Sequence, residues 1–201
     1  MKKFILSALF VCAAMIGFTS CGPDEPVYEG VETNFAGGEY FGDLLGTGTY
    51  NFVMRFESKD YAADSVVRAG SYYVIDLSSE SNKGLLPKEG TYTIVKNFNY
   101  AAGTITYGVA EHIEEGMGSY GYSATTGMGY LFDAGTVTID KKGDNFTIEA
   151  EIFSGTNKVM FRYEGALLFQ DKSESSVVAN RASRNVKVEN LNQVVSLISK
   201  K

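Results

Sequence analysis

The stretch that decides the fold is residues 136–168, which read TVTIDKKGDNFTIEAEIFSGTNKVMFRYEGALL. Apolar and polar residues alternate over 146–152 and again over 159–164. A period of two is typical of antiparallel strands with one buried and one solvated face. The first turn contains Gly143, and glycine readily supplies the positive φ of a short hairpin loop. Residues 136–168 therefore predict a three-stranded antiparallel meander.

The rest of the central region has the same character. Six further strands are predicted, at 39–43, 47–57, 71–77, 90–96, 103–111 and 128–133. Together with the meander this makes nine short strands, and no segment between them has a helical period. Many short strands at regular spacing are typical of an all-β barrel or sandwich. The sequence therefore predicts an all-β domain of about 8–9 strands, either a β-barrel or a β-sandwich.

The N-terminus has the layout of a secretory signal peptide. Lys2 and Lys3 precede an apolar run over residues 4–17. A charged start followed by about 7–15 apolar residues is typical of such signals. The run is also shorter than the roughly 17–25 residues that a membrane-spanning helix needs. We therefore expect residues 1–20 to be a signal peptide.

The end of the signal resembles the lipobox of bacterial lipoproteins. The sequence there is Phe18-Thr19-Ser20-Cys21, with two small residues before a cysteine, although Phe18 stands where leucine is usual. The resemblance implies that Cys21 receives diacylglycerol and that the Ser20–Cys21 bond is cleaved. Acyl chains such as palmitate on Cys21 would then bind the protein to a membrane, because two or more chains give stable attachment. The alternative is an ordinary secreted protein without a lipid.

The residues after Cys21 indicate where in the cell envelope the protein is located. Residues 22–26 read GPDEP, which resembles the acidic export signal of Bacteroidetes surface lipoproteins. The chain as a whole is similar to small all-β lipoproteins of that group, many of which are antiparallel, calycin-like barrels with no assigned activity. The resemblance implies a protein anchored in the outer membrane and exposed at the cell surface. The expected organisation is a flexible tether at 21–34, a β domain at 35–170 and a C-terminal tail at 171–201, with or without a short helix.

Charge and cysteine content narrow the function classes. Loss of the signal would leave 24 acidic and 16 basic residues, a net charge of −8. A strongly acidic chain argues against a nucleic-acid partner, because such proteins need basic patches. Cys12 would be lost with the signal and Cys21 acylated, so we expect no disulfide to stabilise the fold.

No catalytic constellation is apparent, and we predict neither a metal nor a cofactor. The one histidine, His112, has only Glu114 in reach on the same strand face, whereas zinc sites usually have several His or Cys ligands. Residues 116–121 (GMGSYG) match Gly-x-Gly-x-x-Gly, but no helix is expected after them, as a dinucleotide site would require. A glycoside hydrolase needs only two carboxylates, so that class stays open as a less favoured alternative.

The aromatic residues give the remaining indication of function. The chain has 13 Tyr, 13 Phe and no Trp. A long glycine-rich loop is expected at about 114–127, and its Tyr120 and Tyr122 are weak candidates for ligand binding. Tyr72, Tyr73 and Tyr92 are better explained by packing within the sheet. The leading hypothesis is a non-catalytic surface protein that binds a glycan, a small apolar ligand or a partner protein. The alternative is a structural or accessory subunit of an outer-membrane complex.

Overall fold

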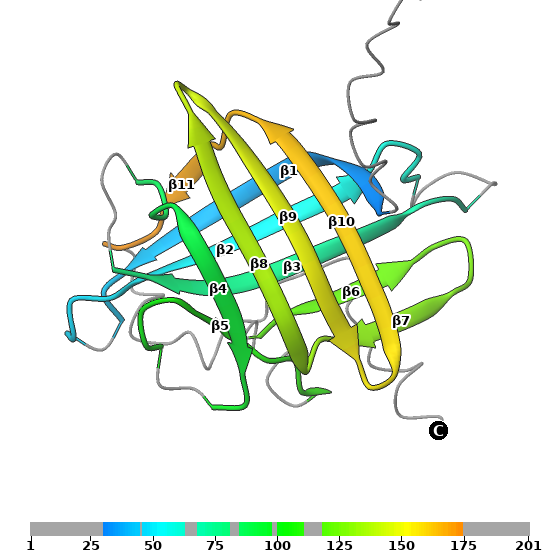
Figure 1. The fold of residues 1–201 in the computed structure, drawn as a ribbon, viewed down its shortest axis with the longest axis horizontal. Coiled ribbons are helices and arrows are strands. Elements are labelled where there is room, and N and C mark those ends of the chain that lie inside the picture. The colour runs from blue at the N-terminus through cyan, green and yellow to red at the C-terminus, as the bar shows by residue number, and fades with distance from the viewer. Residues whose placement is uncertain are drawn as a thin grey trace, which may run out of the picture.

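The structure is a computed structural model that describes residues 30–44, 46–62, 68–80, 85–97, 100–110 and 118–174. These residues form one mixed sheet of eleven strands (Figure 1). The strands are β1 (Val31–Gly42), β2 (Tyr50–Ser58), β3 (Ser71–Ser79), β4 (Gly90–Val95), β5 (Thr104–Thr106), β6 (Tyr120–Ser123), β7 (Met128–Leu131), β8 (Ala134–Lys142), β9 (Asn145–Ser154), β10 (Asn157–Gly165) and β11 (Phe169–Asp171).

Eight of the strands close into a barrel. The order around the wall is β1-β2-β3-β5-β4-β8-β9-β10, and β10 returns to β1. Six of these contacts are antiparallel, but β1 with β10 and β4 with β5 are parallel. The predicted β-barrel is confirmed and the sandwich alternative is not formed. The prediction of a wholly antiparallel wall is wrong, because alternation specifies which face of a strand is buried and not the direction of its neighbour.

The predicted meander is strands β8, β9 and β10. Lys142 pairs with Asn145 and Ser154 pairs with Asn157, so each turn has two residues. Gly143 and Gly155 have φ angles of 66° and 59°, the left-handed geometry that short hairpin turns require. The local sequence therefore specified both the strands and their register.

Side chains fill the barrel interior. Its largest fully buried residues are aromatic and aliphatic: Phe52, Phe56, Phe132, Phe161, Met54, Ile75, Leu77, Ile105, Ile139 and Ile148. Burial of such side chains contributes roughly 1.5–3 kcal/mol each. Packing of this core stabilises the barrel in a chain for which we expect no disulfide.

Three strands lie outside the closed wall. The β6–β7 hairpin branches from β3, because residues 71–74 of β3 pair with β6 whereas Leu77 and Ser78 pair with β5. β11 runs parallel to β1 at Gly38–Tyr40. The hairpin therefore extends the sheet beside the barrel, on the side where β10 begins (Figure 1).

Some predicted boundaries differ from the structure. β1 begins at Val31, inside the range expected for the tether, and is much longer than the predicted strand 39–43. Its period-two pattern is interrupted by register shifts at Phe35/Gly37 and Tyr40/Gly42. Bulges of this kind hide a strand from a search for alternation. Of the described residues in the predicted strand 103–111, only the three of β5 form a strand.

The expected loop at 114–127 is wrong at residues 120–123, which form β6. The glycines that suggested a loop serve close packing instead. A Cβ atom on Gly121 would lie 2.9 Å from the Phe132 ring and 3.0 Å from the Tyr72 carbonyl oxygen. Glycine therefore lets β6 approach β3 closely. The predicted signal peptide, Cys21 and the tail from residue 175 onward lie outside the described residues.

Candidate functional site

The barrel wall opens at the start of β10. Val31 and Glu32 of β1 pair with Phe161 and Arg162. Residues 157–160, which precede them in β10, have only β9 as a ladder partner among the described residues. Within the described residues β1 and β10 therefore pair only at Phe161 and Arg162, and the β6–β7 hairpin lies beside the preceding part of β10 (Figure 1).

The far end of the hairpin is fixed to the meander. The Leu131 amide donates to the Ser154 hydroxyl at 3.2 Å, and the Asp133 amide donates to the Phe153 carbonyl at 2.9 Å. The Gly155 amide donates to the Asp133 carboxylate at 3.3 Å. These bonds hold the end of β7 against the β9–β10 turn.

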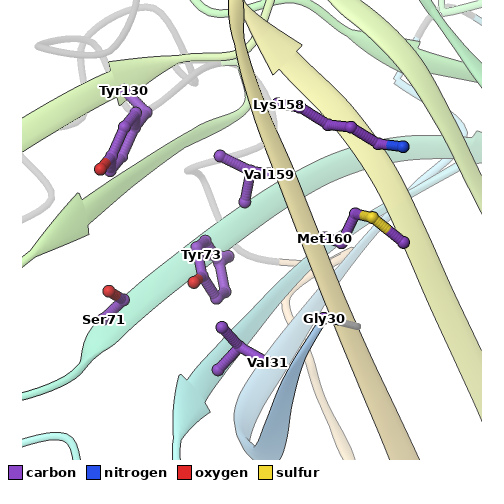
Figure 2. Close-up of a pocket in the computed structure, with 8 residues that line it drawn as sticks. All are labelled: Gly30, Val31, Ser71, Tyr73, Tyr130, Lys158, Val159 and Met160. Atoms are coloured by element: carbon purple, nitrogen blue, oxygen red, sulfur yellow. The ribbon is translucent and has the colours of Figure 1, made fainter. Parts of the chain in front are cut away.

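A pocket of about 340 Å³ lies between β7 and the start of β10, and we call it the seam pocket. Its volume lies within the range of roughly 300–1,000 Å³ typical of small-molecule sites. It is formed by the start of β1, the start of β3, β7 and the start of β10 (Figure 2). The lining residues are Gly30, Val31, Ser71, Tyr73, Tyr130, Lys158, Val159 and Met160.

The lining combines apolar surface with hydroxyl groups. Val31, Val159 and Met160 supply aliphatic contact, whereas Ser71, Tyr73 and Tyr130 each carry a hydroxyl. Burial raises the pKa of Tyr73, and a hydrogen bond with Ser71 partly opposes the rise. The Tyr73 hydroxyl therefore stays protonated at neutral pH and can both donate and accept a hydrogen bond.

The charged group in the lining already has a partner. Lys158 Nζ lies 3.1 Å from a carboxylate oxygen of Glu151 on the neighbouring strand β9. Val159 and Phe161 face the barrel interior, so Lys158 belongs to the outer face of β10. Figure 2 shows its side chain directed away from Tyr73 and Tyr130. The inner part of the seam pocket is thus polar through hydroxyl groups rather than through a charge.

Tyr120 and Tyr122, the two tyrosines that the sequence marked, lie elsewhere. Both are buried in a second cluster on the outer face of β3, which we call the outer tyrosine cluster: Tyr61, Tyr72, Tyr120 and Tyr122. The Tyr72 ring contacts the other three at centroid distances of 5.6–6.2 Å. Arg55 lies 4.4 Å from the Tyr72 ring centroid. Burial raises the pKa of both Tyr72 and Tyr120.

A buried carboxylate ties the chain before β6 to β3. Asp76 is fully buried, and its two oxygens accept from Asn51 Nδ2 at 2.8 Å and from the Gly118 amide at 2.9 Å. The Asp76 amide donates to the Ser119 hydroxyl at 3.0 Å. These bonds position the entry to β6 and hence the hairpin that forms one side of the seam pocket.

The histidine and the glycine motif are the remaining candidates from the sequence. His112 and the first two residues of the glycine motif lie outside the described residues. In the described ranges, no three His, Cys, Asp or Glu side chains are grouped to hold a metal ion. No helix in those ranges has the length and apolar character needed to cross a membrane.

Sequence reasoning missed the seam pocket as a site. Tyr73 was assigned to packing within the sheet, and it does pack in the core, as do Tyr92 in the barrel and Tyr72 in the outer tyrosine cluster. The pocket depends on where β1 starts to pair with β10 and on where β7 lies, and neither long-range contact leaves a local pattern in the sequence. Comparison of the chain with protein-family models, with curated proteins and with solved structures gave no match.

Proposed function

We propose that this protein is a non-catalytic binding protein, anchored in the outer membrane through acyl chains on Cys21 and exposed at the cell surface, which takes a small ligand in the seam pocket. The anchoring rests on the lysines, apolar run and lipobox-like residues of the N-terminus. The binding role rests on one structural observation, a pocket of ligand size whose lining is apolar with a few hydroxyl groups.

The packed interior supports the seam rather than the barrel centre as the ligand site. In many barrels with a binding role, which include the calycin-like barrels that this chain resembles, the ligand lies inside the barrel. Here wholly buried rings such as Phe52, Phe56 and Phe161 occupy that space. A calycin-like role for this protein would therefore use the opening between β7 and β10.

The position of the seam pocket fits a protein held close to a membrane. Gly30 lines the pocket and is nine residues from Cys21. Nine residues of fully extended chain span at most roughly 30 Å. A lipid on Cys21 would therefore keep the pocket near the membrane surface.

Two measurements test the proposal. Mass spectrometry of the protein purified from membranes should find a chain that starts at Cys21 and carries acyl chains; an intact leader with a free Cys21 thiol would refute the anchoring. For the pocket, Val31→Trp should abolish binding of small apolar ligands and glycans found by a panel screen. Leu168→Trp, at a residue that is 79% exposed and outside the pocket, should leave binding unchanged. Equal binding by both variants would refute the pocket.

A subunit role in an outer-membrane complex is the second candidate. Among the described residues β7 has a strand partner, β6, on one edge, whereas its other edge has the side-chain contact of the Leu131 amide with Ser154 but no strand partner. Unpaired edges are templates for strand addition by another chain. Recovery of a stoichiometric partner after crosslinking in intact membranes would support this role. A glycoside hydrolase is less favoured, because none of the eight residues that line the seam pocket is a carboxylate.

A further inference from the structure

The chemistry of the seam pocket narrows its ligand class, an inference that rests on the proposed binding function. The side chains on the inner side of the seam pocket are of two kinds. Val31 and Val159 are aliphatic, and the rings of Tyr73 and Tyr130 extend this apolar surface. The hydroxyls of Tyr73, Tyr130 and Ser71 lie on the same side of β10 (Figure 2). Such a lining complements a molecule with an apolar part and a polar part.

The local charges disfavour a charged polar part. An anionic group would need a free cation, but Lys158 is paired with Glu151 and points away from the tyrosines. Asp60 is close enough to act electrostatically on Tyr73, and its negative charge would oppose an anion there. A cationic group would find no carboxylate among the lining residues, because Asp60 acts on Tyr73 from outside the lining and cannot pair directly with a group in the pocket. Loss of hydration without an opposite charge is costly for either ion.

Hydroxyl groups suit an uncharged, hydrogen-bonding head. A hydroxyl is both donor and acceptor, as are the hydroxyls of sugars and glycerol. The tyrosine rings also offer flat apolar surface with a polar edge, which favours molecules that are apolar on one side and polar on the other. We propose that the seam pocket binds an uncharged amphiphile, with its aliphatic part against Val31 and Val159 and its polyol head at the hydroxyls of Tyr73, Tyr130 and Ser71.

The test compares three ligands that share an eight-carbon chain and differ in the charge of the head: octyl β-glucoside, octanoate and octyltrimethylammonium. Each is titrated by calorimetry, below its micelle-forming concentration, into the full-length chain carrying Cys21→Ser, which cannot be acylated. We expect the glucoside to bind at least about tenfold more tightly than either ion, because only the ions lose favourable hydration without compensation. Binding of octanoate or of the cation as tightly as the glucoside would overturn the inference while leaving the pocket intact.

Three variants localise the binding. Tyr130→Phe keeps the ring and removes one hydroxyl, so it should weaken glucoside binding by about three- to tenfold. Lys142→Gln, at an exposed lysine of β8 that does not line the seam pocket, should change it by less than about twofold. Val31→Trp should abolish binding. No binding by any of the three ligands, or unchanged binding to Val31→Trp, would overturn the proposed binding site itself. Unchanged glucoside binding to Tyr130→Phe would overturn only the assignment of the head group.

Discussion

Tyr73 of β3 stacks face to face on Phe161 of β10, with ring centroids 4.7 Å apart and an angle of 4° between the planes. Phe161 is also the first residue of β10 to pair with β1, opposite Val31. The stack therefore joins two walls of the barrel at the point where the seam begins to open. Both residues belong to the core of the barrel, and Tyr73 also lines the seam pocket.

Truncation of Phe161 should destabilise the barrel strongly. Phe161 is wholly buried and also packs against Phe56, at a centroid distance of 5.1 Å. We expect Phe161→Ala to lower the free energy of unfolding by about 3–5 kcal/mol, through lost burial and the cavity that remains. Urea denaturation measures this, with Leu168→Ala as the control that should change stability by less than about 0.5 kcal/mol. A loss below about 1 kcal/mol for Phe161→Ala would contradict the packing described.

Removal of a tyrosine hydroxyl should change the free energy of unfolding in opposite directions at Tyr72 and Tyr92. The Tyr72 hydroxyl is buried and has no hydrogen-bond partner in the part of the chain that the structure describes, so Tyr72→Phe should raise the free energy of unfolding by about 1 kcal/mol. The Tyr92 hydroxyl donates to the Lys88 carbonyl at 2.6 Å and lies 3.2 Å from the Ser79 hydroxyl. Tyr92→Phe should therefore lower it by about 1–2 kcal/mol. Thermal unfolding of the two variants side by side checks the prediction, and equal losses would refute it.

Substitutions at Asp76 should distinguish the effect of its size on stability from the effect of its hydrogen bonds. Asp76→Asn keeps the size but replaces one acceptor oxygen with a donor, which would face either Asn51 Nδ2 or the Gly118 amide. We expect a loss of about 2 kcal/mol for Asp76→Asn and about 3 kcal/mol for Asp76→Ala, because either the buried Gly118 amide or Asn51 Nδ2 loses an acceptor in the first variant and both lose one in the second. Asp140→Asn, at an exposed position of β8, serves as the control in the same denaturation series. No loss for Asp76→Asn would mean that these contacts do not hold the entry to β6.

Stability should fall at alkaline pH. Burial is the main cause that raises the pKa of Tyr72, Tyr73, Tyr92, Tyr120 and Tyr163 above the ordinary value of 10.0. The folded state binds these protons more tightly than the unfolded chain does, and below pH 10 both states are protonated. As the pH rises above 10 the unfolded chain ionises first, so the free energy of unfolding falls.

The titration of phenolate absorbance checks this behaviour. The five tyrosines whose pKa is raised should ionise only above pH 10, together with loss of the folded circular-dichroism signal. A single phase near pH 10 for all 13 tyrosines, with the fold intact, would contradict the burial described.

The fold was more predictable than the candidate site, for physical reasons that particular residues make clear. The meander β8–β10 is encoded locally, in the alternation of residues 146–152 and in the turn glycines Gly143 and Gly155. β1 was largely missed because two register shifts break its period. β6 was missed because Gly121, which allows close approach to β3, has the local appearance of a loop residue.

The seam pocket itself could not be derived from the sequence. Its residues come from four strands that are separated along the chain, and Val31 and Val159 meet only because the parallel pairing of β1 with β10 begins at Phe161. Side chains such as Tyr73 are also of types that are common in an ordinary hydrophobic core. Only the arrangement of the strands distinguishes a buried tyrosine that packs from one that also lines an opening.

The claim that the seam pocket is the binding site is tested most directly by methyl NMR of the full-length chain carrying Cys21→Ser during titration with octyl β-glucoside. We predict saturable shifts at the methyl groups of Val31 and Val159, with none at the exposed methyl groups of Leu168. Equal shifts at Leu168, or shifts that leave Val31 and Val159 unmoved, would contradict it.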